Sequence, residues 1–287
     1  LGMAGLQPAS DYLDLAKRVP VDADPQIWGD VADSLRGLDR YYDGTGERQA
    51  RFRKFAVATL RPVMARVGWD AKPGEADPVA IQRTDLIAAL SQLGDEQVIA
   101  EARRRFAASE TDPNAMPAAL RRTILGVVAV HADNATWDKL HTMAKNEKTP
   151  LVRDQLYTML SISEDPAIAQ KALDLALTDE PGETNSAGMI AAVAGDHPDM
   201  AFDFATTHRD EVGKRVDTTS SSRYYPGLAN GSLDPAMVGK LRAYADKYIS
   251  ASSRRPTETA IATIEYRTKV KRERLPAIDA WLEKHGG

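Results

Sequence analysis

The side chains best suited to metal binding or acid–base chemistry are five histidines, His131, His141, His197, His208 and His285. No two of them have the H-E-x-x-H spacing, which places two metal ligands one helical turn apart around a carboxylate. His131 and His141 could meet across a helix hairpin, but two separate, partly exposed histidines at helix ends are favoured because this spacing specifies so little. We therefore expect no metal ligand and no catalytic residue in the chain.

Other catalytic and binding classes also lack support. The sequence has no phosphate-binding glycine loop and no G-x-S-x-G nucleophile elbow. It has no cysteine, which excludes disulfides and thiolate chemistry, and its net charge of −4 disfavours a nucleic-acid partner. No stretch approaches the roughly 18 apolar residues of a membrane span, so we expect no membrane partner. A Ser-His-Asp triad stays open, because such triads are defined by geometry rather than by spacing.

Helical periodicity recurs from one end of the sequence to the other. We expect helices over 11–19, 25–42 and 48–67, where apolar residues follow at steps of three and four. Asp77-Pro78 predicts the start of another helix, with Asp77 as N-cap and Pro78 at the first helical position, and Asp95 predicts the start of the next. In all we expect about sixteen helices and no strand.

Short breakers separate these helices, for example Thr149-Pro150, Asp165-Pro166 and Asp234-Pro235. Each short helix has one apolar stripe, which it must bury against its neighbours in a stack. The fold class predicted is therefore all-α, an α-α superhelix of the HEAT or armadillo type built from stacked antiparallel helix pairs. Since no linker interrupts the pattern, residues 1–287 are expected to form a single domain.

Several segments together carry a resemblance to a known family. The connection Val67-Gly68-Trp69-Asp70-Ala71-Lys72-Pro73-Gly74-Glu75 is followed by a helix with Arg83 and then by Ala102 to Phe106. This order resembles the C-terminal helical domain of the zinc aminopeptidases that include aminopeptidase N and the puromycin-sensitive enzyme. Leu120-Arg121 is similar to that domain's Leu-Arg pair, and Ser220 to Ser222 fall where it has a stretch of small residues. Arg223-Tyr224-Tyr225 departs from it, since a more apolar run is usual there.

The resemblance implies a function that the chain performs jointly with another domain. The family's separate catalytic domain binds zinc through H-E-x-x-H and a later Glu, and holds the substrate amine with G-x-M-E-N; both motifs are absent from this chain. Zinc is therefore expected in the parent enzyme and no cofactor in this chain. The C-terminal domain would form a bowl that closes over the active site, so its partners would be the catalytic domain of the same polypeptide and peptide substrates.

On that interpretation the candidate substrate contacts are Arg83, Arg121, Arg223 and Tyr225. Guanidinium groups suit a peptide carboxylate because they can form paired hydrogen bonds with it. From composition alone, the segment Ser220 to Ser222 is better explained as a capped helix start, with a serine as N-cap, than as a patch of hydroxyls facing a cavity.

Two other functions remain open. Periodicity alone equally favours a free-standing HEAT-like scaffold that binds a protein partner along one face. An independent enzyme would need a cluster of Asp, His and Ser in a deep pocket, for which the sequence gives no sign. The compartment is undetermined, either the cytoplasm or, in a bacterium, export to the periplasm.

Overall fold

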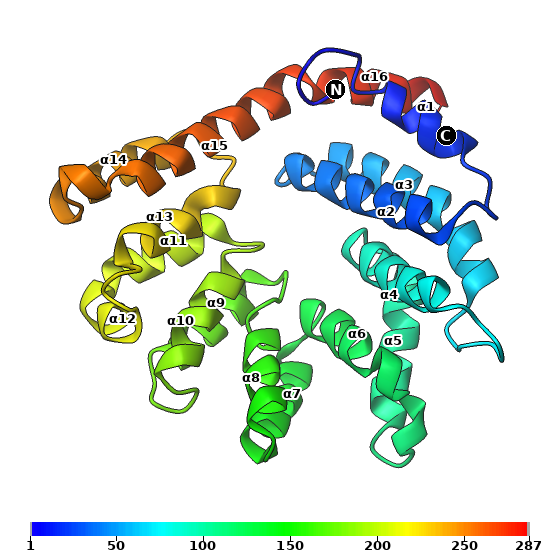
Figure 1. Ribbon diagram of the computed structural model, residues 1–287, viewed down its shortest axis with the longest axis horizontal. Helices are drawn as coiled ribbons and strands as arrows, with labels where there is room; N and C mark the ends of the chain where they lie inside the picture. The colour runs from blue at the N-terminus through cyan, green and yellow to red at the C-terminus, as the bar shows by residue number, and fades with distance from the viewer. Residues whose placement is uncertain (1, 286–287) are drawn as a thin grey trace. The chain divides into compact units, whose positions relative to one another are not determined.

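The computed structural model describes residues 2–285, which are helical almost throughout (Figure 1). Sixteen α-helices and four short 3-10 helices follow one another, and no strand occurs among the described residues. Most of the helix–helix contacts join elements that are close to one another in the chain. The prediction of an all-α, α-α superhelix fold is therefore confirmed.

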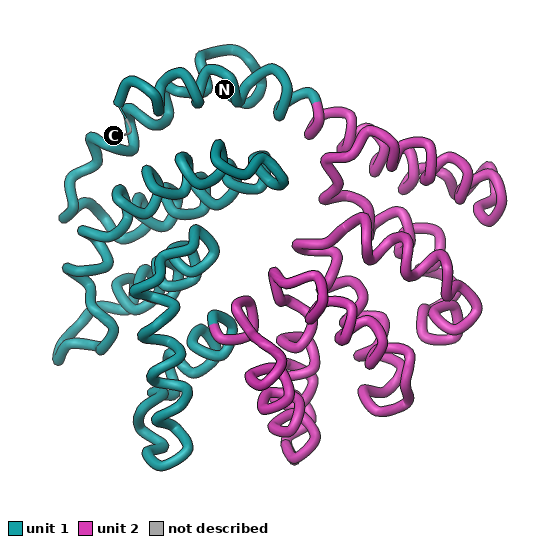
Figure 2. The backbone as a smooth tube through the Cα atoms, turned by 180° about the vertical axis from the view of Figure 1, so that it is seen from behind, with its two compact units in different colours: residues 1–127, 269–287 teal, residues 128–268 magenta. Residues whose placement is uncertain are grey.

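The chain divides into two compact units, residues 1–127 with 269–287, and residues 128–268 (Figure 2). The sequence pattern does not reveal this division, and a single domain over residues 1–287 stays a prediction. Two helices cross from one range to the other, α6 (Ala118–Val130) and α15 (Arg255–Glu273).

The first unit holds the helices from both ends of the chain. Within it α2, α3 and α4 pack on one another, α5 packs on α4, and α16 packs on α3. Its core includes the fully buried side chains of Trp28, Tyr42, Phe52 and Leu60. The helices that lie wholly within this unit are α1 (Asp11–Arg18), α2 (Pro25–Asp39), η1 (Arg40–Tyr42), α3 (Glu47–Val67), α4 (Asp77–Gln92), α5 (Glu96–Ala108), η2 (Pro113–Ala115) and α16 (Leu275–His285).

The second unit is a continuous stretch of chain. Helix α10 packs on its neighbours α8, α9, α11 and α12, and α13 packs on α11. Trp137 is buried there and donates its indole N–H to the carbonyl of Leu160 at 2.9 Å. Its helices are α7 (Asn134–Asn146), α8 (Pro150–Met159), α9 (Pro166–Ala176), α10 (Glu183–Val193), α11 (Pro198–Thr207), α12 (Arg209–Arg215), α13 (Ser221–Leu228), η3 (Ala229–Gly231), α14 (Met237–Tyr248) and η4 (Ala251–Ser253).

Aspartate followed by proline explains where several helices begin. The Asp24 carboxylate accepts a hydrogen bond from the backbone N–H of Gln26 at 2.8 Å, and Pro25 starts α2. Proline fits there because the first helical N–H has no intrahelical partner. At Asp77-Pro78 the prediction was wrong by one residue: Ala76 is the N-cap and Asp77 already lies in the helix, without a side-chain cap.

Candidate functional site

Arg83, the first candidate contact, lies on α4 with its side chain only 3% exposed. Its Nε donates to the carbonyl of Gly68 at 2.8 Å, and Nη1 and Nη2 donate to the two carboxylate oxygens of Glu75 at 2.7 and 2.5 Å. A further bond joins Nη2 to the carbonyl of Val67 at 3.4 Å. The hydrogen bond from Arg83 holds the pKa of Glu75 below its usual value. Arg83 therefore ties the α3–α4 connection to α4, and a direct peptide contact would require these bonds to break.

The same connection is fixed at a second point by α5. The guanidinium of Arg105 donates to both carboxylate oxygens of Asp70 at 2.9 and 3.1 Å and lies over the Trp69 ring, 5.2 Å from its centroid. Its Nε donates to Glu101 at 2.8 Å, one turn earlier on the same helix. The Trp-Asp dipeptide thus has a structural role here, as the partner of a buried cation.

Arg121, the second candidate, is exposed near the start of α6. No hydrogen bond or ion pair links its guanidinium to another described side chain, so it is free to meet a ligand. Its neighbour Arg122 is also exposed. Because successive residues on a helix point about 100° apart, these two arginines project in different directions.

Arg223 and Tyr225 both lie on α13, but they point to different sides of it. Arg223 is exposed, and its Nη2 donates to the hydroxyl of Ser220 at 3.0 Å. Tyr225 is fully buried, and its hydroxyl donates to the carbonyl of Arg209 at 3.4 Å. Ser220 is the N-cap residue of α13, although its side chain makes no capping hydrogen bond. Of this pair, only Arg223 is placed to touch a peptide without rearrangement.

Tyr225 belongs to a tyrosine cluster made of Tyr224, Tyr225, Tyr244 and Tyr248. Successive rings lie 5.1 to 5.4 Å apart between centroids, and the guanidinium of Arg209 lies 4.1 Å from the Tyr248 centroid. Burial raises the pKa of Tyr225 to about 12, so its hydroxyl stays protonated as a donor. This cluster joins α12, α13 and α14, and explains why the departure from the family's apolar run is tolerated: aromatic rings fill the core instead.

Two histidine–carboxylate pairs were missed by the sequence analysis. His131 and His141 do not meet; His131 Nδ1 lies 2.6 Å from Glu164, and His141 Nε2 hydrogen bonds to Glu180. Tyr157 also donates to Glu180, at 3.1 Å, and burial with this carboxylate raises the pKa of Tyr157 to about 12. The glutamates come more than thirty residues after the histidines, so no local pattern could have revealed the pairs.

Comparison with known proteins identifies the family. A model of the ERAP1-like C-terminal domain matches residues 1–266, which is nearly the whole chain. The chain belongs to the ERAP1-like C-terminal domain family. The resemblance to the C-terminal helical domain of zinc aminopeptidases is thereby confirmed.

Curated relatives of this ERAP1-like domain are plant aminopeptidases. Aminopeptidase M1-A of Oryza sativa subsp. japonica is 24% identical over 99% of this chain, and the match covers 32% of that protein. Aminopeptidase M1 of Arabidopsis thaliana is 23% identical over 74% of this chain and 25% of its own length. The ERAP1-like domain thus spans about a third or less of the curated relatives it matches.

The residues of the ERAP1-like domain do not suit the zinc that its relatives' family implies. Within residues 2–285, no three His, Asp or Glu side chains converge on a point that could hold a metal ion. The two histidine–carboxylate pairs offer too few ligands each. In the same described part, no helix is long and apolar enough to cross a membrane.

Proposed function

We propose that this chain is the non-catalytic C-terminal domain of a zinc-dependent aminopeptidase, where it closes over the active site of the catalytic domain and contacts peptide substrates. The observation that carries the proposal is the match of the ERAP1-like family over residues 1–266, together with relatives that are aminopeptidases. In this proposal zinc belongs to the catalytic domain, where it activates a water molecule for hydrolysis.

The substrate contacts we propose are the exposed guanidinium groups of Arg121 and Arg223. Each extends from a helix that is anchored by buried side chains, Leu120 and Ile124 beside Arg121 and Tyr225 beside Arg223. A peptide carboxylate can accept two parallel hydrogen bonds from such a group. Arg83 and Tyr225 enter the proposal differently, as residues that position the α3–α4 connection and α13.

The contacts are tested with Arg121→Ala and Arg223→Ala in the complete polypeptide that carries this chain. KM is measured for a peptide of several residues and for a single-residue aminoacyl substrate. We expect KM for the longer peptide to rise about fivefold, the value of about 1 kcal/mol for one exposed charged contact, while the short substrate is unaffected. Arg122→Ala is the matched control, because it removes the same charge from the next position of α6. An equal change for both substrates would contradict the proposed contacts.

The joint function has a separate test. An antibody to this chain would be used to isolate the native polypeptide, whose mass and aminopeptidase activity are measured with and without a zinc chelator. A polypeptide much heavier than 31.3 kDa with chelator-sensitive activity supports the proposal. An inactive polypeptide of this mass bound to another protein would favour the scaffold alternative instead.

A further inference from the structure

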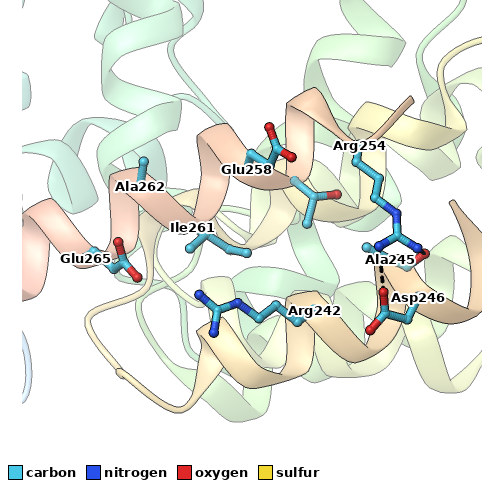
Figure 3. A pocket seen from close by; sticks show the side chains of 9 residues that line it. Arg242, Ala245, Asp246, Arg254, Glu258, Ile261, Ala262 and Glu265 are labelled. Atoms are coloured by element: carbon cyan, nitrogen blue, oxygen red, sulfur yellow. Dashed lines mark hydrogen bonds and ion pairs between the residues drawn. The ribbon is translucent and has the colours of Figure 1, made fainter. Parts of the chain in front are cut away.

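A pocket with a volume of about 400 Å³ lies between α14 and the first half of α15, wholly within the second unit (Figure 3). Ala245, Ile261 and Ala262 form its apolar part. Its volume is within the range of small-molecule sites, which combine apolar walls with a few placed polar groups. None of the residues proposed to contact peptides lines this α14–α15 pocket.

The charged groups of the pocket are of two kinds. Arg254 and Asp246 close one end with an ion pair of 2.6 Å. Arg242 on α14 and Glu258 and Glu265 on α15 have no such bond to any described side chain. Figure 3 shows the Arg242 side chain extending past Ile261 toward Glu265. The pocket thus presents a free cation and free carboxylates on opposite walls, with aliphatic surface between them.

A second feature indicates a polar ligand. Thr257, which also lines the pocket, is 3% exposed, and its hydroxyl has no hydrogen-bond partner. A buried polar group without a partner destabilises the folded protein, so such groups are uncommon unless they serve a ligand or hold water. Its hydroxyl can both donate and accept a hydrogen bond.

We propose that the α14–α15 pocket binds a small aliphatic zwitterion, of the class of a free α-amino acid. Its carboxylate meets the guanidinium of Arg242, and its ammonium group meets the carboxylate of Glu265, with Glu258 adding negative potential. The aliphatic side chain packs on Ile261 and Ala245. A ligand with one charge only would leave the opposite wall unpaired, and a large one would exceed the pocket.

The probe is photo-leucine, an amino acid that keeps both charges and forms a covalent bond to nearby residues when irradiated. It is applied to the complete polypeptide after its aminopeptidase activity has been removed with a zinc chelator, so that leucinamide and Leu-Leu are not hydrolysed to leucine. Labelled peptides are identified by mass spectrometry, so that binding elsewhere in the protein is seen separately. We expect labelling within residues 242–265 that L-leucine suppresses. N-acetyl-leucine, which lacks the ammonium group, and leucinamide, which lacks the carboxylate, should fail to suppress it. Suppression by the dipeptide Leu-Leu at lower concentration than leucine would assign the pocket to dipeptides within the same zwitterion class.

Variants give the second readout. Arg242→Gln and Glu265→Gln should each weaken leucine's suppression about tenfold or more, as expected for the loss of a charged hydrogen bond. Lys214→Gln and Glu211→Gln are matched controls, since both side chains are exposed on α12 and the charge changes are the same. Thr257→Val should weaken binding while leaving the unliganded protein no less stable. Labelling spread evenly over the surface, or labelling that persists in both Arg242→Gln and Glu265→Gln, would overturn the proposal. The comparison of leucine with its N-acetyl and amide derivatives is made on the wild type, so it does not depend on any variant folding.

Discussion

Replacing Arg83 by methionine removes a buried guanidinium while keeping an unbranched side chain in its place. The substitution breaks the two bonds to Glu75 and leaves the carbonyls of Gly68 and Val67 without this donor. Breaking a buried ion pair from one side typically lowers the free energy of unfolding by about 3–5 kcal/mol. Glu75 is only partly buried and can regain water after the substitution, so we expect a loss at the lower end of this range, about 3 kcal/mol. For a unit of this size that corresponds to a decrease in Tm of about 6–12 °C.

The assay is urea unfolding followed by circular dichroism at neutral pH, with Arg66→Met as control. Arg66 is exposed at the end of α3, and its loss should change stability by less than about 0.5 kcal/mol. A second readout is the pH dependence. The pKa of Glu75 lies below its ordinary 4.5 in the folded protein because Arg83 hydrogen bonds to it, so the unfolded chain binds more protons as the pH falls. The wild type should therefore lose this stabilisation below about pH 4.5, and Arg83→Met should not. A loss of less than about 1 kcal/mol in Arg83→Met, with an unchanged acid profile, would refute the structural role given to Arg83.

Three further predictions concern other buried or strained positions. The hydrogen bond from Arg104 helps to lower the pKa of Glu101 to about 2. Glu101 should therefore stabilise the protein above pH 4.5 and lose that effect as the pH falls toward 2. In an acid titration, the free energy of unfolding of Glu101→Gln should decline less steeply than that of the wild type. Gly68→Ala should lower the free energy of unfolding by about 1–3 kcal/mol, because φ of 74° and ψ of 175° suit glycine almost alone. Gly37→Ala inside α2 should instead raise it by about 0.5–1 kcal/mol. Equal shifts in Tm for the two variants would contradict this difference. Asp39→Asn weakens the bidentate hydrogen bond from Arg53 to a buried carboxylate, so it should lower the free energy of unfolding by about 1–3 kcal/mol. In thermal unfolding, its effect must exceed that of Asp33→Asn, which changes an exposed carboxylate.

The fold could be predicted from the sequence because helix formation is a local property. Apolar spacing and Asp-Pro starts placed the helices to within a few residues, as at Pro25 and Asp95. Periodicity was less successful at deciding which apolar residues are buried. Leu15, Ile27 and Ile81 follow the apolar spacing of their helices, yet they are 62%, 47% and 61% exposed. Which side of a helical stripe meets a neighbour depends on packing partners that a single helix does not specify.

The candidate site was harder to predict, because the role of an arginine depends on what surrounds it. Arg83 and Arg121 are chemically identical and both lie on helices, but only Arg83 has a carboxylate and two carbonyls within reach. Glu75 lies in a connection, whose path is set by tertiary contacts rather than by local pattern. The free charges of the α14–α15 pocket were overlooked for the same reason: Arg242 and Glu265 become neighbours only when two helices pack.

The first unit joins the two ends of the chain, and this has a consequence for synthesis. Tyr42 and Arg48 bond to Asp279 at 2.9 and 2.6 Å, and Arg51 pairs with Glu283 at 3.0 Å. The ribosome synthesises α1 to α5 long before α16, so the bonds of Tyr42, Arg48 and Arg51 to α16 cannot form until the end of this chain has been made. The second unit, encoded without interruption by residues 128–268, can finish folding first. Within this stretch of the polypeptide the order of completion therefore differs from the order of synthesis: α1 to α5 are made before the second unit, but their unit is complete only after α16 has followed it.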